Sequence, residues 1–220
     1  MYSLKNNLMK NIFTGMSFLF ITFFLLPNLK GQNTIVTTNP DTEQRWEKIY
    51  DNEKKTAENI YYPDSSLWMT VTYSPDSEEN WKSYYANGNP YFEATIVNNL
   101  LQGRYRIWYE NGQLAESINF KDNLEDGMAE FFHPNGQLAM KGAFKEGQMV
   151  GEWEFFDKVG NPPTGMWEWK FAASRENTRV KGLLIYGKPS GTWINWTTAN
   201  QGKPNQKKFF RDYQLEMFVN

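Results

Sequence analysis

The string Asn-Gly-Gln-Leu-Ala begins at Asn111 and returns at Asn135, 24 residues later. Single glycines keep the same step, because Gly103, Gly127 and Gly151 each open a short aromatic run. A fixed period of this size marks a repeat architecture in which each repeat is one supersecondary unit. We therefore expect the chain to fold by stacking copies of one small motif.

Each copy has the pattern of a β-hairpin. In the first copy, Asn111-Gly112 stands between two runs rich in aromatic and branched residues, 105–109 and 113–120. Asn and Gly both tolerate positive φ, so the pair predicts a type I′ turn. The second linker (Lys121–Asp126, before Gly127) predicts a wider hairpin loop. The predicted fold is all-β, an open antiparallel meander of successive hairpins of about 24 residues each.

Apolar and polar residues alternate along the expected strands, which predicts one buried and one solvated face. The apolar parity in two copies is Leu114, Ile118 and Phe120, and Leu138, Met140 and Phe144. Trp108, Phe132 and Phe156 occupy the otherwise polar parity at matching repeat positions. Two interpretations remain: an aromatic ladder that stabilises the sheet, or an exposed strip that binds a partner. With Trp167 and Trp169 of the later run GMWEWKF, these residues are the candidate ligand- or partner-binding residues.

The repeats divide the chain. Regular repeats cover residues 79–160 and irregular ones 165–215, within an array over 61–220. Residues 32–60 form an N-terminal capping segment, in which Asp41 and Gln44 have capping-box spacing and the following apolar residues have helical spacing. This predicts a short helix at the first edge of the array, where terminal repeats are usually atypical. The irregular loops at 172–178 and 197–206 are where a specialised role is expected.

The N-terminus has the layout of a secretory signal peptide over residues 1–31. Lys5 and Lys10 precede an apolar run over 12–26, and Gly31 follows. The alternative is a retained membrane anchor, although spanning usually needs about twenty apolar residues. We expect an exported chain, periplasmic or at the outer surface.

Composition excludes several classes of protein. The chain has no cysteine, which excludes disulfides, a lipid-bearing N-terminal Cys and zinc–thiolate sites. Its formal charge is −2, and it becomes more acidic without the three lysines of the first 31 residues. Nucleic acids and anionic lipids are bound through Lys and Arg clusters, so neither is an expected partner.

No constellation of residues predicts catalysis. His133 is the only histidine and is expected to be an ordinary turn-flanking residue, without the carboxylate and nucleophile of a catalytic histidine. The acidic loops at 75–79 and 121–126 lack EF-hand spacing and are expected to be solvated turns. Glu152 and Glu154 lie on one strand face about 7 Å apart, a geometry available to a glycosidase but common on exposed strands. No catalytic residue, metal or cofactor is expected.

With these residues in view, the chain resembles the MORN-type repeat proteins, and more closely their bacterial variant. The variant repeat reads Gly-x-Trp-x-x-Phe/Tyr, then Asn-Gly-x-Leu, then an aromatic residue and a loop ending in Gly. It is met by Gly103, Trp108, Asn111, Gly112, Leu114 and Phe120; by Gly127, Phe132, Asn135, Gly136, Leu138 and Phe144; and by Gly151, Trp153 and Phe156. The resemblance implies a sheet of successive hairpins and a role in protein or membrane interaction. The antitoxin label of many bacterial members does not suit an exported chain, nor does phosphoinositide binding suit an acidic one.

The sequence favours a non-enzymatic interaction or scaffold protein with a protein partner in the cell envelope. The alternative is a glycan-binding module that uses exposed aromatic side chains. Aromatic residues make up 17% of the chain, and sugar rings can stack on such flat side chains.

Overall fold

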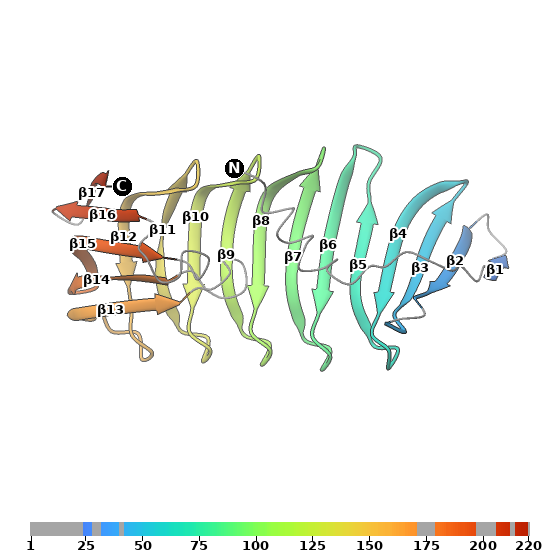
Figure 1. Cartoon of the computed structure of the whole chain (residues 1–220), viewed down its shortest axis with the longest axis horizontal. Helices are drawn as coiled ribbons and strands as arrows, with labels where there is room; N and C mark the ends of the chain where they lie inside the picture. The colour runs from blue at the N-terminus through green and yellow to red at the C-terminus, as the bar shows by residue number, and fades with distance from the viewer. Residues whose placement is uncertain are drawn as a thin grey trace. The chain divides into compact units, whose positions relative to one another are not determined.

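The structure, a computed structural model, describes residues 24–27, 32–39, 42–170, 179–196, 206–211 and 214–219. Every regular element within these ranges is a β-strand (Figure 1). The described part of the chain therefore has no helix of the length and hydropathy needed to cross a bilayer. The predicted signal peptide lies outside the described residues, except for the short strand β1.

The described residues form two compact units. The first ends at Gly103 and includes Glu110–Gly112, whereas the second contains Arg104–Tyr109 and resumes at Gln113. In the first unit each strand from β1 to β6 pairs antiparallel with the next. Its strands are β1 (Phe24–Pro27), β2 (Gln32–Thr38), β3 (Arg45–Asp51), β4 (Lys54–Tyr61), β5 (Leu67–Tyr73), β6 (Glu78–Tyr84) and β7 (Pro90–Val97), and β8 (Leu100–Trp108) passes from this unit into the second.

The second unit contains a regular meander and a smaller sheet. The meander continues antiparallel through β9 (Leu114–Lys121), β10 (Leu124–Phe132), β11 (Leu138–Lys145) and β12 (Gln148–Phe155). The smaller antiparallel sheet consists of β13 (Gly165–Lys170), β14 (Arg179–Ile185), β15 (Lys188–Trp196), β16 (Gln206–Arg211) and β17 (Gln214–Val219). One pairing, Glu152 with Gln214, joins β12 to β17. The predicted all-β meander of hairpins is thus confirmed. The expected loops at 172–178 and 197–206 lie almost entirely outside the described residues.

The predicted N-terminal helix is wrong, because residues 45–61 form the hairpin β3–β4. A two-residue turn closes it, with positive φ at Asn52 and Glu53. Positive φ at two successive residues is typical of a type I′ hairpin turn and is incompatible with a right-handed helix. The Asp41–Gln44 spacing does not cap a helix either, since the Asn39 carbonyl and side chain accept from Glu43 and Thr42 in the turn before β3.

The two turn types are also the reverse of those predicted. Each Asn-Gly loop combines a turn of negative φ with one left-handed glycine, such as Gly136 at φ 84°. The type I′ turns with two positive φ values occur at the other linkers: Asn98-Asn99, Asp122-Asn123 and Glu146-Gly147. Asn135 explains the difference, because its Oδ1 accepts from the Gln137 N–H (3.1 Å) and its Nδ2 donates to the Lys158 carbonyl in the next loop (2.8 Å). Asn is thus needed as a local cap and as a link between loops, for which positive φ is unnecessary.

A β-bulge changes the face of the sheet on which Leu138 lies. Phe131 pairs with Met140 but Phe132 pairs with Leu138, so Ala139 is the extra residue. An extra residue reverses the alternation of side chains. Leu138 therefore shares the face of Phe132, and the prediction that Leu138 and Met140 lie on one face is wrong.

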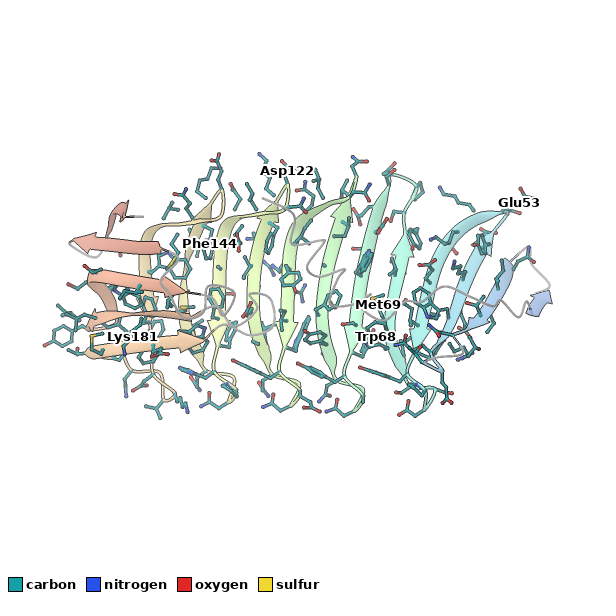
Figure 2. All side chains as sticks on the ribbon, in the orientation of Figure 1. Glu53, Trp68, Met69, Asp122, Phe144 and Lys181 are labelled. Atoms are coloured by element: carbon teal, nitrogen blue, oxygen red, sulfur yellow. The ribbon has the colours of Figure 1, made fainter. Side chains whose placement is uncertain are left out.

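The buried face of the second unit is rich in aromatic residues. Phe131, Trp153 and Phe155 are at most 1% exposed, and the Trp153 ring lies 5.1 Å from that of Phe144, which is labelled in Figure 2. The smaller sheet packs on this face, since the ring centroids of Trp193 and Phe155 are 5.2 Å apart. We call this the core face of the meander, and the opposite face, which carries Phe132, its outer face.

Candidate functional site: the outer aromatic row

Three candidate residues lie at one repeat position on the outer face. Trp108 ends β8, Phe132 ends β10, and Phe156 follows β12. All three are half-buried, whereas Phe131 and Phe155 beside them point into the core and are at most 1% exposed. Trp108, Phe132 and Phe156 are called the outer row below. The row therefore exposes part of each ring while the rest is held by packing.

Hydrogen bonds from the core side fix the backbone of the row. The Tyr109 hydroxyl donates to the Phe132 carbonyl (2.7 Å), and His133 Nε2 lies 3.0 Å from the Phe156 carbonyl. A carbonyl only accepts, so His133 carries a proton on Nε2. Tyr109 and His133 occupy the same repeat position, and each spans one repeat. They hold successive members of the row at a constant interval.

Burial keeps this tyrosine protonated. Burial, with a smaller contribution from the nearby Glu116 carboxylate, raises the pKa of the Tyr109 hydroxyl to about 12. His133 is only 4% exposed and was expected to be an ordinary turn-flanking residue. Its hydrogen bond to the Phe156 carbonyl, one repeat further along the chain, explains why a buried polar side chain is accommodated there.

Charged side chains flank the row, and those beside Phe156 form ion pairs with one another. The Arg106 guanidinium lies 5.9 Å from the Trp108 ring and the Lys141 ammonium 6.0 Å from the Phe156 ring, both within cation–π range. Lys141 also pairs with Glu154 at 3.0 Å, and Glu154 accepts from Lys188 at 3.1 Å.

Lys188 also bridges the carboxylate pair considered in the sequence, because it contacts Glu152 at 3.0 Å as well as Glu154. Hydrogen bonds from Lys141 and Lys188 hold the pKa of Glu154 below its usual range. Burial opposes the charge on Lys188, but its bonds to the two glutamates leave its pKa raised. A glycosidase acid needs a raised pKa, and Glu154 has the opposite shift.

Trp167 and Trp169 do not join the outer row. They lie on β13 opposite Gly182 and Val180, on the inner side of the smaller sheet. Their rings approach His133, with centroids 6.4 and 5.3 Å away. Within the described chain, their buried Nε1 atoms have no hydrogen-bond partner. These two tryptophans contribute to packing between the smaller sheet and the meander.

A small pocket lies at the end of the row. Its volume is about 130 Å³, and it is lined by Glu154, Phe155, Phe156, Pro162, Tyr186, Gly187 and Lys188. The turn of Tyr186 and Gly187 forms one wall, and the Phe155 N–H donates to the Gly187 carbonyl (2.8 Å). A Cβ on Gly187 would lie 2.6 Å from the Phe155 carbonyl oxygen, so only glycine permits this approach.

A family of known repeats matches this part of the chain. The MORN repeat variant family matches residues 80–98, 101–122 and 125–146. Residues 80–146 are three consecutive MORN variant repeats. Each matched segment contains one Asn-Gly loop with the strands on either side. Trp108 and Phe132 fall inside the MORN variant repeats, whereas Phe156 and the pocket follow them.

Comparison with other proteins adds little beyond the repeats. No curated protein matches the sequence. A crystal structure of TarM has a TM-score of 0.30 and 11% identity, covering 43% of this chain and 20% of that one. A TarM mutant from S. aureus, in complex with Fondaparinux, alpha-GlcNAc-glycerol and UDP, has a TM-score of 0.36 and 8% identity over 68% and 24%. The Glycosylation Associate Protein (Gap123) complex from Streptococcus agalactiae has a TM-score of 0.21 and 15% identity over 71% and 24%. This chain therefore spans about a quarter or less of each of those chains.

Sequence reasoning identified the outer row but missed the pocket beside it. The 24-residue period reaches Phe156, whereas Tyr186 stands outside it. A signal was nevertheless present, because Tyr186-Gly187 follows Glu146-Gly147 by 40 residues, as Trp193 follows Trp153. In the described part of the chain, no group of three His, Cys, Asp or Glu side chains is placed to hold a metal ion.

Proposed function

We propose that this chain is an exported, non-enzymatic interaction or scaffold protein that binds an envelope protein through the outer row. The single observation that carries the proposal is the recurrence of half-exposed Trp108, Phe132 and Phe156 at one repeat position. Aromatic side chains are enriched at the centres of protein interfaces. The repeated hydrogen bonds from Tyr109 and His133 supply a rigid backbone, which lowers the entropic cost of binding.

The polar groups near the row support a non-enzymatic role. His133 is engaged with a backbone carbonyl, and Glu152 and Glu154 are engaged with Lys188. A general acid or base must be free to reach a substrate proton. These residues instead have structural partners.

Capture from solubilised envelope tests the proposal. The full chain is immobilised in three forms: wild type, Phe132→Ser with Phe156→Ser, and Leu183→Ser. Leu183 is 39% exposed on β14 of the smaller sheet and serves as the matched control. We expect one discrete protein that the wild type and the control retain in stoichiometric amount and that the double variant loses. Equal retention by all three forms would exclude the outer row as the binding surface.

Fractionation tests the export part of the proposal. A tagged chain is expected in the periplasmic or outer-surface fraction, with a mass that lacks about the first 31 residues. A full-length chain in the inner membrane would favour the retained anchor. A cytosolic chain of full mass would contradict export.

The pocket gives a reason to keep glycan binding as a second candidate. Phe156, Tyr186 and Pro162 offer flat apolar walls, and Glu154 and Lys188 offer hydrogen-bonding groups at the same place. Small-ligand sites combine such walls with a few polar groups. Titration with envelope polysaccharides, read by tryptophan fluorescence, tests this candidate. It requires a saturable change that Tyr186→Ala abolishes.

A further inference from the structure

We propose that the outer row binds a neutral, proline-rich segment of its partner in the polyproline II conformation. The segment crosses the strands, with prolines three residues apart against Trp108, Phe132 and Phe156. The next ring then enters the pocket between Phe156 and Tyr186. This inference rests on the proposed function, and it names the chemistry of the partner.

The spacing of the row supports this conformation. Phe132 and Phe156 are two strands apart, because β11 lies between β10 and β12. Neighbouring strands are about 4.8 Å apart, so the step along the row is about 9.6 Å. A polyproline II helix has three residues per turn and rises about 3.1 Å per residue, which gives about 9.3 Å per turn. An extended strand returns to the same face every ~6.8 Å and an α-helix every ~5.4 Å, so neither matches one step.

An apolar side chain lies between two of the rings. Leu138 pairs with Phe132 across the bulge and shares its face, and it is half-buried like the row. The Phe156 N–H donates to the Ala139 carbonyl (2.8 Å), which holds Phe156 beside the start of β11. Leu138 therefore places an apolar side chain on β11, between β10, which carries Phe132, and β12, which precedes Phe156. In other domains, proline-rich segments bind to surfaces lined by aromatic side chains.

The charge of the row favours a neutral segment. Lys141 and Lys188 are both paired with Glu154, at 3.0 and 3.1 Å. Lys141, Lys188 and Glu154 already have partners of opposite charge and therefore attract a charged segment only weakly, whereas proline rings carry no charge and no backbone N–H. Exposed Gln137 adjoins Leu138 and can donate to the peptide carbonyls, which a polyproline II helix leaves free.

The pocket suits the last ring. Its volume of about 130 Å³ is lined by Phe156, Pro162 and Tyr186 on its apolar sides. At about 30 Å³ per water molecule, it has room for about four waters, or for one small ring. Tyr186 is 77% exposed and therefore accessible to a ligand.

Peptide titration tests the inference. The full chain is titrated with two labelled neutral peptides of equal length and composition, and binding is read by fluorescence anisotropy. One peptide has proline at every third position and the other has the same prolines irregularly spaced. We expect the regular peptide to bind at least tenfold more tightly. Equal binding of the two, or no binding of either, would overturn the inference.

Variants locate the binding surface. Phe132→Ala should weaken binding of the regular peptide at least tenfold. Phe132→Leu keeps an apolar side chain but loses the flat ring, and it should weaken binding severalfold. Tyr186→Ala should weaken it severalfold, and Leu183→Ala should leave it unchanged. Circular dichroism verifies that each variant is folded. Unchanged binding by Phe132→Leu and Tyr186→Ala, or displacement of the peptide by envelope glycan alone, would contradict the inference.

The two proposals fail separately. If the row captures an envelope protein but the regular peptide has no advantage, the polyproline II inference is wrong and the interaction role stands. If the Phe132→Ser, Phe156→Ser variant captures the same protein as the wild type, the proposed interaction surface itself is wrong.

Discussion

The hairpins β11–β12 and β14–β15 are the same structure at two places in the second unit. Both have a two-residue turn, Glu146-Gly147 in one and Tyr186-Gly187 in the other. In both, a tryptophan from the second strand covers a glycine of the first. An ideal Cβ on Gly142 or on Gly182 would lie 2.2 Å from the indole ring of Trp153 or Trp193, respectively. The strand register also breaks at equivalent positions, 40 residues apart.

The two hairpins differ in what surrounds their turns. A Cβ on Gly147 would meet only the Glu125 and Leu124 side chains, the nearer at 3.4 Å. A Cβ on Gly187 would lie 2.6 Å from the Phe155 backbone oxygen. One repeat unit thus has the same core in both places. In both, the turn glycine donates a hydrogen bond to a neighbouring backbone carbonyl, but only the Gly187 turn lies against the backbone of Phe155 and the ring of Pro162. The shared Gly–Trp core therefore specifies the hairpin, whereas the turn can differ between copies and, in β14–β15, forms a wall of the pocket.

Removing the tryptophans should have the largest effect. Trp153 is 1% exposed and Trp193 4%. Trp153→Ala and Trp193→Ala should each lower the free energy of unfolding by about 3–5 kcal/mol, because each leaves a large cavity. Chemical denaturation measures this. If Trp193→Ala costs less than half as much as Trp153→Ala, the two cores are not equivalent.

Filling the glycine positions should have the next largest effect. Gly142→Ala and Gly182→Ala should each cost about 3 kcal/mol, because the added methyl overlaps the indole. The double variant Gly142→Ala, Trp153→Ala provides the control, since the methyl then enters a cavity. The free energy of unfolding of this double variant should equal that of Trp153→Ala alone. A full additive loss would show that the contact with Trp153 is not the cause.

The turn glycines should separate the two hairpins. Gly147 and Gly187 have φ values of 79° and 73°, so alanine is strained at both positions, by about 1 kcal/mol. Gly187→Ala must also displace backbone, and we expect a total loss of about 2–3 kcal/mol. Thermal and chemical denaturation of both variants test the difference. Equal losses would mean that the packing of the Tyr186 turn against β12 contributes nothing.

The period of the sequence was sufficient to predict the hairpins but not their turns. Asn-Gly suits a type I′ turn when only φ is considered. In the structure Asn135 instead bonds to Gln137 and Lys158, and the second of these partners lies in the next repeat. Rules that predict a turn from its own residues cannot include a contact with the next repeat. The helix predicted near Trp46 failed for a related reason, because pairing of β3 with β2 and β4 outweighs a short helical spacing.

The candidate site, like the fold, was predicted only in part from the sequence. Trp108, Phe132 and Phe156 stood out because they break the alternation at one repeat position, and the structure places all three half-exposed on the outer face. Trp167 and Trp169 were grouped with them by residue type alone, and they face His133 instead. The pocket depends on the Tyr186 turn meeting β12, a contact between segments about 30 residues apart. Only tertiary structure creates it.

The ion pairs beside the pocket should give the smallest effect, and one with a defined pH dependence. The pKa of Glu154 is lowered from its ordinary 4.5, so its contribution to stability is complete above that value and is lost as the pH falls through the folded pKa. The pKa of Lys188 is raised from 10.5, so its contribution is complete below 10.5 and is lost as the pH rises through the folded pKa. The side chain of Glu154 is 37% exposed, and solvent screening limits the cost of Lys188→Met at neutral pH to ~0.5 kcal/mol.

Lys181→Met is the matched control, since the Lys181 ammonium lies 3.8 Å from a Glu168 carboxylate oxygen and both side chains are exposed. Denaturation curves across the acid range should show the difference between wild type and Lys188→Met disappearing as Glu154 is protonated. Lys181→Met should show a smaller loss at neutral pH. If the two variants behave alike, the bridge from β15 to Glu152 and Glu154 adds no more than any exposed pair. The Tyr186 turn would then be held against β12 by its backbone hydrogen bonds and by packing alone.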